Sequence, residues 1–343
     1  MGDCCCSSPC CCGEANPAAG IPVVSTRLSI KDRWGDCKVR LDWGRMHYAV
    51  DPGLYAVGKP DENAPVLVSA NYKLTFDSLR KELDGLDCWL LILDTKGVNV
   101  WCASGKGAFG TEELIARIAQ TRLAEVVSHK TLILPQLSAV GVSAHDVKRQ
   151  SGFSVEYGPV RAQDIKPFLA SGRTATEEMR TVRFNLRDRL VLTPVEVVLA
   201  MKKALILFGG LFLLNLFAAR PFGLGDFIAF MGAILVGTVL TPVFLPVIPG
   251  RAFAAKGGLA GLLWAVVSVW INGWMGPFLW LPLAGYVLVL PSVSAFLAMN
   301  FTGSATYTSF SGVMKEMRAA IPVMAAAAAA GLVLLILYRI FGL

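Results

Sequence analysis

One cysteine is placed where its thiol could bind a ligand. Cys102 lies in the segment Asn-Val-Trp-Cys-Ala-Ser-Gly-Lys at residues 99–106. The segment follows an apolar run at 89–94, which predicts a buried strand, and it precedes a helix start near 110–113. Ligands of open α/β sheets dock at the ends of such strands, and a thiol held there suits a soft metal ion. A lone cysteine beside a strand is also an ordinary small core residue, so spacing alone leaves both interpretations open.

The elements around Cys102 alternate between strand and helix. Four short runs predict strands, the first of them at 64–70 and the others at 89–94, 130–137 and 154–158. Helices are predicted to start at Thr75 and Ala144, and a longer helix over 111–127 has Thr111 as its expected N-cap. The stretch from 26 to 62 is mixed and stays unassigned. The alternation predicts a parallel, Rossmann-like α/β sheet.

The second half of the chain is much more apolar than the first. The chain is 54% hydrophobic with a mean hydropathy of +0.54, which is too apolar for an ordinary soluble protein. Thr193, Pro194 and Glu196 predict the start of a helix that continues into an apolar span at 204–219. Four further spans follow at 226–248, 258–275, 277–299 and 319–341, each near the roughly 20 residues that a bilayer core needs. A tight turn near Gly276-Pro277 separates the third span from the fourth.

Charge predicts the orientation of these five spans. The net charge is +7, and much of the basic excess lies close to the spans, so we interpret it as membrane topology and predict no nucleic-acid binding. The positive-inside rule predicts a multi-pass inner-membrane protein with its N-terminal domain in the cytoplasm and its C-terminus on the other side. Asp226 and Arg220 fall at the edge of a span, and interior ionisable residues are nearly absent. The spans are therefore expected to anchor rather than transport.

The cysteines are unevenly distributed. Six of the nine fall in the first twelve residues, and the others are Cys37, Cys88 and Cys102. The α/β region thus has no spaced disulfide framework, which predicts a reducing compartment. The layout expected from the sequence is a disordered, cysteine-rich tail over 1–20, an α/β domain over 21–170, a linker over 171–192 and a helical membrane domain over 193–343.

Residues 99–106 resemble the cap-helix motif of the HgcA family, the corrinoid proteins of microbial mercury methylation. Residues 66–77 and 93–97 resemble the same family and also the large subunit of the corrinoid iron–sulfur protein, the methyl carrier of the acetyl-CoA pathway. The order of a soluble α/β domain followed by a membrane domain is similar to the HgcA layout. The Trp101-Cys102 pair is what separates the mercury-methylation branch from the carrier, and Ser104 stands where Ala is common in the family.

The resemblance implies a cytoplasmic corrinoid-binding domain in which Cys102 is the lower axial ligand of cobalt. The corrinoid (cobalamin) would be base-off, and Asn99, Trp101, Ala103, Gly105 and Lys106 would complete the cap. Lys106 lies four residues after Cys102, so on a helix its ammonium shares a face with the sulfur and could favour the thiolate. The bland alternative is a solvated lysine.

The implied reaction is methyl transfer from methyl-cobalt to Hg(II), which yields methylmercury. The methyl group must leave as a carbanion equivalent, and a thiolate opposite it pushes electron density onto the metal, as it does in haem proteins. The implied partners are a ferredoxin-like iron–sulfur protein as electron donor and a methyl-donor protein or methyltetrahydrofolate. The cysteine-rich tail could capture Hg(II), or it could be a low-complexity segment with no fixed site.

Several further residues follow predicted strands, where a corrin would rest. These are Asn71, Lys73, Thr75, Thr95 and Gly97, and, for the nucleotide tail, Gln136, Ser138, Gly141 and Val142. For each of them an ordinary turn or surface role is an equal alternative. Two rival functions also stay open: a membrane-anchored methyl carrier for another acceptor, and a membrane receptor or transporter that only binds a corrinoid.

Overall fold

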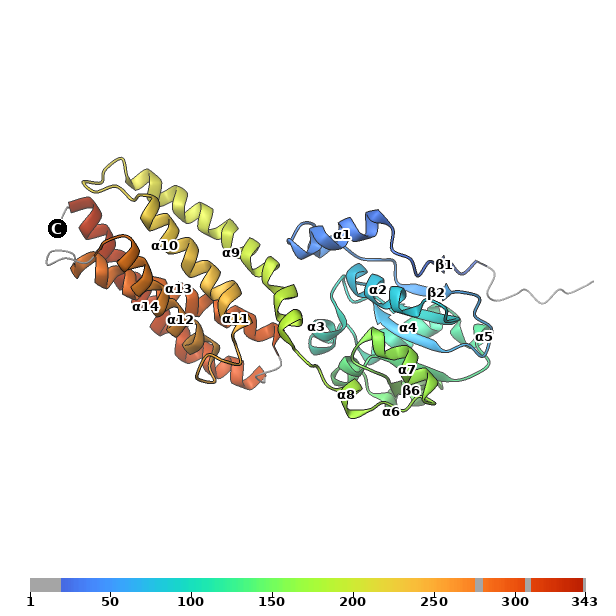
Figure 1. The fold of residues 1–343 in the computed structure, drawn as a ribbon. Coiled ribbons are helices and arrows are strands. Elements are labelled where there is room, and N and C mark those ends of the chain that lie inside the picture. Colours follow the sequence, from blue (N-terminus) through green and yellow to red (C-terminus); the bar gives the residue numbers. More distant parts are fainter. Residues whose placement is uncertain (1–19, 275–279, 306–309, 342–343) are drawn as a thin grey trace, which may run out of the picture. The chain divides into compact units, whose positions relative to one another are not determined.

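The computed structural model describes residues 20–274, 280–305 and 310–341, and Figure 1 shows the path of the chain. The chain divides into two compact units. The first extends to Val182 and the second begins at Arg183, except that residues 38–43 group with the second. The predicted tail, apart from Gly20, and the predicted turn near Gly276-Pro277 lie outside the described residues.

The first unit is built on a six-stranded sheet in the order β1-β2-β4-β3-β5-β6. The strands are β1 (Val23–Val24), β2 (Gly53–Val57), β3 (Val66–Ala70), β4 (Cys88–Leu93), β5 (Thr131–Leu134) and β6 (Ser154–Tyr157). All neighbouring pairs are parallel except β2 and β4, which are antiparallel. The sheet is therefore mixed, and the prediction of a parallel sheet was wrong for the β2–β4 pair. The missed strand β2 is short and begins at a Pro-Gly pair, which resembles a turn in sequence.

Helices cover both faces of the sheet, as Figure 1 shows. They are α1 (Ile30–Arg40), α2 (Lys73–Arg80), α3 (Val100–Gly105), α4 (Thr111–Gln120), α5 (Leu123–Val126), α6 (Ala144–Ser151), α7 (Ile165–Ala170) and α8 (Glu177–Arg180). Short 3-10 turns are η1 (Arg45–His47), η2 (Lys81–Leu83), η3 (Gln136–Val140) and η4 (Ala162–Asp164). Alternate residues of β4 face opposite cores: Leu91 packs with Leu114 of α4, and Leu90 packs with Phe76 of α2. This alternation follows from the two-residue period of a strand.

The direction in which strands are added to the sheet reverses at β3. Because β3 lies between β4 and β5, the chain crosses over β3 as it passes from β4 to β5. The three strands are parallel, so their carboxyl ends, Ala70, Leu93 and Leu134, lie at the same edge of the sheet. Ligands of open α/β sheets bind outside the carboxyl ends at such a reversal. We call this edge the carboxyl edge; the α3 segment leaves from it.

The helix predicted over 111–127 differs from the structure in its length and in its N-cap. The helix expected over 111–127 breaks at Arg122, whose φ of 48° is left-handed, after Thr121 Oγ1 bonds back to the carbonyl of Arg117 at 2.8 Å. Its N-cap is Gly110 rather than Thr111, because Thr111 Oγ1 accepts the backbone N–H of Ser143 at 2.9 Å. The side chain of Thr111 thus joins α4 to the start of α6.

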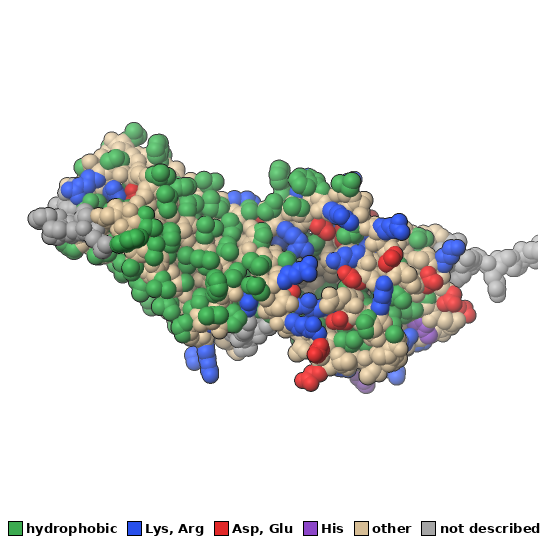
Figure 2. Space-filling view, viewed as in Figure 1, with side chains coloured by type: hydrophobic (Ala, Val, Ile, Leu, Met, Phe, Trp, Pro, Cys, Tyr) green, Lys and Arg blue, Asp and Glu red, His purple; other side chains and the backbone are tan. Residues whose placement is uncertain are grey.

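The second unit is helical. Its elements are α9 (Leu186–Leu214), α10 (Leu224–Leu235), the π-turn η5 (Val236–Leu240), α11 (Thr241–Val243), α12 (Phe253–Ile271), α13 (Trp280–Asn300), η6 (Phe301–Ser304) and α14 (Phe310–Phe341). Within the described residues, five helices are long and apolar enough to cross a membrane, as predicted. In Figure 2 hydrophobic side chains cover the helical part, whereas charged side chains gather over the α/β part.

The first long helix begins earlier than expected. Asn185 Oδ1 accepts the N–H of Asp188 at 3.0 Å, and the Asp188 carboxylate accepts the N–H of Asn185 at 3.0 Å, which forms a capping box. Thr193 is therefore not the cap, and Pro194 lies inside α9. Proline cannot donate to the carbonyl of Leu190, but the hydroxyl of Thr193 donates to that oxygen at 3.0 Å. This bond explains how α9 continues through the proline.

Asp226 lies in the first turn of α10, at the edge of its span as predicted, but it is buried. It is 3% exposed and accepts the N–H of Gly223 at 2.7 Å, the hydroxyl of Tyr286 and, at 2.5 Å, an N–H of Arg339. These residues belong to α10, α13 and α14, so the cluster joins three helices. Sequence patterns did not indicate these contacts, because the partners are far apart in sequence. Glycines also join the helices: a Cβ on Gly261 would lie 2.8 Å from the Cα of Pro291, so α12 and α13 meet backbone to backbone.

Candidate functional site

The helix that carries Cys102 leaves the carboxyl edge after β4, as predicted. Asn99 caps α3, because its Oδ1 accepts the N–H of Cys102 at 2.9 Å. Val100, Ala103 and Ser104 are buried against the core. Trp101, Cys102, Gly105 and Lys106 are exposed, and Cys102 is a free thiol. We call these four residues the outward edge of α3.

The inner side of α3 is tightly packed, and the outward edge is open. A Cβ on Gly141, just after η3, would lie 2.4 Å from the carbonyl oxygen of Phe109 and 2.9 Å from that of Ser104. The Ser104 hydroxyl donates to the carbonyl of Val100 at 2.7 Å, so this buried polar group has its partner within α3. A Cβ on Gly105 would meet no atom within 4 Å. Packing therefore fixes the core-facing side of α3, and the space next to its outward edge is open.

The turn before α3 is organised by one buried side chain. Asn71 Oδ1 accepts three bonds, from the N–H of Thr95 at 3.1 Å, its hydroxyl at 2.8 Å and the N–H of Gly97 at 3.0 Å. Asn71 is 5% exposed and Thr95 is fully buried. Gly97 has a left-handed φ of 69°, which other residues rarely adopt. The structure thus brings these three predicted residues together, and it uses their polar groups to shape the turn that presents α3.

Lys73 and Thr75 do not lie on a loop, because α2 already begins at Lys73. The Lys73 ammonium pairs with Asp32 at 2.7 Å and with the fully buried carboxylate of Asp77. Thr75 lies in the first turn of α2 and is half-buried. The helix start predicted from the sequence was therefore two residues late. The charge of Lys73 is neutralised by Asp32 and Asp77 within the fold.

Of the predicted residues after β5, Val142 and Ser138 are buried, and Gln136 lies at the carboxyl edge. Val142 is 4% exposed and packs in the core, and its carbonyl accepts the Tyr157 hydroxyl at 2.6 Å. Ser138 is fully buried and bonds to the carbonyl of Pro135 at 2.8 Å. Gln136 begins η3, which packs beside α3. Its Oε1 is buried and has no hydrogen-bond partner among the described residues.

The other described thiols differ from Cys102. Cys88 is fully buried at the start of β4, and burial, with the charge of Asp87, raises its pKa to about 12. It therefore stays protonated at neutral pH. Cys37 is exposed on α1. Within the described residues, no three His, Cys, Asp or Glu side chains gather in a metal-binding group. Among these three thiols, Cys102 is the one presented on the segment that leaves the carboxyl edge.

Sequence reasoning missed the segment beside the α3 turn. A Cβ on Gly97 would lie 3.6 Å from the Cβ of Ala49 and 3.7 Å from the carbonyl oxygen of Met46. Ala49 also forms an isolated bridge with Tyr72, and the N–H of Val50 donates to the carbonyl of Asn71 at 2.9 Å. Met46 is 70% exposed. The contact joins residues about 50 positions apart, so no local pattern could signal it.

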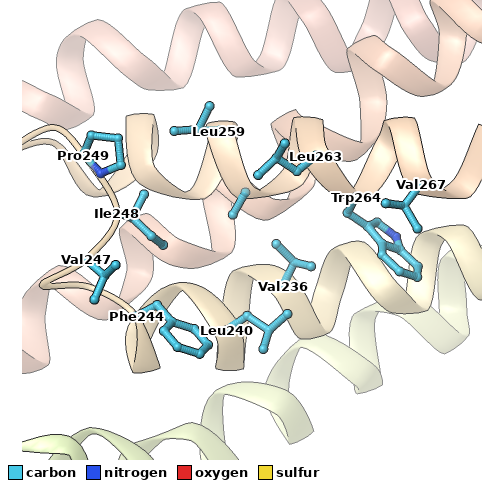
Figure 3. A pocket seen from close by; sticks show the side chains of 11 residues that line it. Val236, Leu240, Phe244, Val247, Ile248, Pro249, Leu259, Leu263, Trp264 and Val267 are labelled. Atoms are coloured by element: carbon cyan, nitrogen blue, oxygen red, sulfur yellow. The ribbon is translucent and has the colours of Figure 1, made fainter.

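Two cavities lie away from this site. One of about 500 Å³ is lined only by apolar residues of η5, α12 and the segment 244–249 before α12, and Figure 3 shows Leu240, Phe244 and Leu263 around it. The other, of about 410 Å³, is lined by residues 23–27 together with Gly58 and Asp87, near the start of β4. The first has no group for acid, base or nucleophilic chemistry, and the second lies at the end of the sheet opposite Cys102.

The α/β region is similar to known proteins of acetyl-CoA metabolism. Residues 43–169 match the family described as the CO dehydrogenase/acetyl-CoA synthase delta subunit. The acetyl-CoA decarbonylase/synthase complex subunit gamma of Methanocaldococcus jannaschii is 36% identical over 127 residues, which are 36% of this chain and 26% of the relative. The same subunit of Methanopyrus kandleri is 36% identical over 122 residues, 35% of this chain and 26% of that relative.

The match is confined to one part of each protein. The chain matches about a quarter of the length of these relatives. The matched residues include β2 to β6 and α3 with Cys102, whereas the helical unit lies outside them. The similarity therefore applies to the region that carries the candidate site.

Proposed function

We propose that this chain is a membrane-bound, corrinoid-dependent methyltransferase that transfers a methyl group to Hg(II) and forms methylmercury. The observation that carries the proposal is the exposed thiol of Cys102, next to Trp101, on a capped helix at the carboxyl edge of the sheet. The similarity of residues 43–169 to acetyl-CoA decarbonylase/synthase subunits supports a methyl-transfer relative. The resemblance of residues 99–106 to the HgcA cap motif supports mercury as the acceptor.

The residues present fit a corrinoid. A soft thiol stands free on the outward edge of α3, and the space over Gly105 admits a bulky group. Gln136 Oε1 is a buried acceptor without a partner among the described residues, and an amide-bearing cofactor has the donor that it needs. Buried polar atoms of proteins are otherwise nearly always paired. The donor set and the open space thus agree with the proposed cofactor.

Each residue of the site has a proposed task. Asn99 and the packing beneath α3 orient Cys102, whose sulfur would bind the cobalt of the corrinoid. Trp101 would cover the thiol from water, and Lys106 would place a positive charge on the same exposed edge. Asn71, Thr95 and Gly97 hold the turn, so they act on the ligand by positioning α3. When bound, the corrinoid supplies the cobalt centre that carries the methyl group.

The proposal extends to location and partners. The helical unit lies in the inner membrane, because its five long apolar helices match the thickness of a bilayer, and the α/β unit is cytoplasmic. A ferredoxin-like iron–sulfur protein supplies low-potential electrons. A methyl-donor protein or methyltetrahydrofolate supplies the methyl group.

The deciding experiment compares Cys102→Ala with the wild type. Full-length protein is loaded with corrinoid, and cobalt X-ray absorption and optical spectra are recorded. We expect a sulfur ligand in the wild type and in Cys37→Ala, the matched exposed-cysteine control, and none in Cys102→Ala. Methylmercury formation from Hg(II) should be lost only in Cys102→Ala. Nitrogen or oxygen ligands alone in the wild type would contradict the axial role of Cys102.

A second candidate is a membrane-anchored methyl carrier for a different acceptor. The names of the relatives that match residues 43–169 favour it, because they refer to an acetyl-CoA complex and not to mercury. The two candidates separate when methylated protein is mixed with Hg(II). Sulfur ligation without methylmercury would favour the carrier.

A further inference from the structure

Helix α1 has one face that is fixed to the α/β fold. Val39, which groups with the helical unit, is 1% exposed on this side of the helix. Asp32 pairs with Lys73 at 2.7 Å and with Arg80 at 2.9 Å, which joins α1 to α2. Three residues on from Asp32, a Cβ on Gly35 would lie 2.3 Å from the hydroxyl oxygen of Tyr48, so only glycine allows this approach. Residues 32, 35, 36 and 39 share this side of the helix.

The opposite face of α1 is apolar and exposed. Ile30, Trp34 and Cys37 recur at spacings of four and three residues, and Leu41 follows at the next turn, so they form one stripe. Ile30 is 88% exposed, Trp34 61% and Leu41 45%. Large apolar side chains that gather in a contiguous exposed stripe mark an interaction surface.

Basic residues border the stripe on both sides. At about 100° per residue, Lys31 and Lys38 fall on one flank and Arg33 and Arg40 on the other. The acidic residues of α1 lie on the fixed side, where Asp32 is paired and Asp36 accepts the Tyr48 hydroxyl at 3.3 Å. The outward face is therefore apolar at its centre and positive at its borders.

The same chemistry continues after the helix ends. Trp43 is 74% exposed and Met46 is 70% exposed, and Arg45 lies between them in sequence. The ammonium of Lys38 lies 5.8 Å from the centre of the Trp43 ring. We call residues 30–46 the basic–aromatic segment.

We propose that the basic–aromatic segment lies flat on the bilayer surface and binds anionic phospholipid. An apolar stripe with tryptophan, flanked by Lys and Arg, is the composition of helices that lie in the plane of a membrane interface. Basic side chains are attracted to anionic headgroups, and tryptophan is favoured at the headgroup level. Because Met46 and Ala49 contact the turn at Gly97, this binding would hold the carboxyl edge of the sheet at the membrane surface. The inference rests on the membrane location in the proposed function and on none of its cobalt or mercury chemistry.

The test uses full-length protein in lipid nanodiscs and a fluorescent label on Cys37. Cys102 and the six N-terminal cysteines are replaced by serine, and Cys88 is fully buried in the fold. Lipids with a nitroxide near the headgroup are the quenchers, in neutral phosphatidylcholine with or without phosphatidylglycerol. In a Cys37→Ser background, Lys148→Cys on α6 and Val266→Cys on α12 provide labels expected outside and inside the bilayer.

We expect the Cys37 label to be quenched in nanodiscs with phosphatidylglycerol and the Lys148→Cys label to stay bright. Replacing Lys31, Arg33, Lys38 and Arg40 by glutamine should reduce quenching at Cys37 to the Lys148→Cys level. Trp34→Asp should reduce it as well. These substitutions leave Asp32, Gly35 and Val39 intact, so the circular dichroism spectrum should not change.

Three results would each overturn the inference or its choice of lipid, and they differ in what else they imply. If the Val266→Cys label is quenched and the Cys37 label is not, the membrane location stands, and the stripe is covered by another part of this chain or by a protein partner. If neither label is quenched, the membrane location in the proposed function fails as well. Equal quenching at Cys37 in neutral and anionic lipid would overturn the choice of anionic phospholipid.

Discussion

Each unit contains a cluster of charged residues that joins its helices, and the two clusters differ in their surroundings. In the α/β unit, Lys73 and Arg80 share Asp32 and Asp77 and thereby join α1 to α2. The side chains of Lys73 and Asp32 are 24% and 19% exposed, so water reaches them. In the helical unit, Asp226 pairs with Arg339 and accepts the hydroxyl of Tyr286, and the side chains of Asp226 and Arg339 are only 5% and 12% exposed.

The comparison shows which polar groups are already bound within the fold and which are available to a ligand. In both clusters the carboxylates are paired with cations and accept hydrogen bonds. The first cluster joins α1 to α2, and the second joins α10 to α13 and α14. Both oxygens of Asp226 accept bonds, which fits an anchoring role for the helical unit better than a proton relay. The outward edge of α3 is different, because its thiol is exposed while the groups beneath it are fully used. The following predictions test this contrast between fastening and reactive regions.

The largest expected effect is in the helical unit. Asp226→Ala leaves the Arg339 charge without its carboxylate, and breaking a buried pair in this way costs about 3–5 kcal/mol of unfolding free energy. Thermal unfolding in detergent should show the loss, and adding Arg339→Leu should restore part of it. Unchanged stability in Asp226→Ala would mean that the cluster does not fasten the helices.

The next effect distinguishes fastening from ligand binding at Lys73. Lys73→Met removes one of the two cations that serve the buried Asp77, and we expect a loss of about 2 kcal/mol. Denaturant unfolding measures this loss, and corrinoid titration of the folded protein should give wild-type affinity. A large drop in affinity without a loss of stability would make Lys73 a ligand contact.

Two glycines test the two sides of α3. Gly141→Ala places a Cβ against the carbonyls of Phe109 and Ser104, and overpacking of this kind costs about 1–3 kcal/mol. The matched substitution Gly105→Ala meets no atom within 4 Å, so stability should hold or rise slightly. Corrinoid binding should nevertheless weaken in Gly105→Ala, because the methyl group occupies space over the outward edge. Equal corrinoid affinity in Gly105→Ala and wild type would place the ligand elsewhere.

The smallest expected effect is a pH dependence of stability that comes from Asp32, the partly exposed carboxylate of the α1–α2 cluster. Burial alone would raise the pKa of Asp32, but bonds from Lys73, Ser29 and Arg80 outweigh it and hold this pKa well below its ordinary 3.8. The stabilisation that ionised Asp32 provides is complete above pH 3.8, and it is lost as the pH falls from 3.8 toward the lowered pKa. Asp32→Asn should therefore cost roughly 1 kcal/mol at pH 7 and flatten the acid loss of stability, as measured by denaturant unfolding. An unchanged acid limb would show that Asp32 is not the titrating group.

Much of the fold was predictable because its signals are local. Apolar runs marked β3 to β6, and five apolar stretches marked the long helices. The short helix after β4 that carries Cys102 was also predictable, from its place between a strand and a helix start. Strand β2 was missed because a five-residue strand that begins at a Pro-Gly pair has little pattern of its own. The start of α9 was misplaced because Thr193-Pro194 resembles a cap, whereas the box at Asn185 and Asp188 forms one.

The sequence by itself determined the buried strands, the apolar helices and the presence of a cysteine on a helix at a strand end, because periodicity and capping act over a few residues. Only the tertiary structure decided what the polar residues do. Lys73 pairs with Asp32, 41 residues away, and Asp226 pairs with Arg339, 113 residues away. Such pairs depend on how the chain returns on itself, and that path is set by the packing of whole elements.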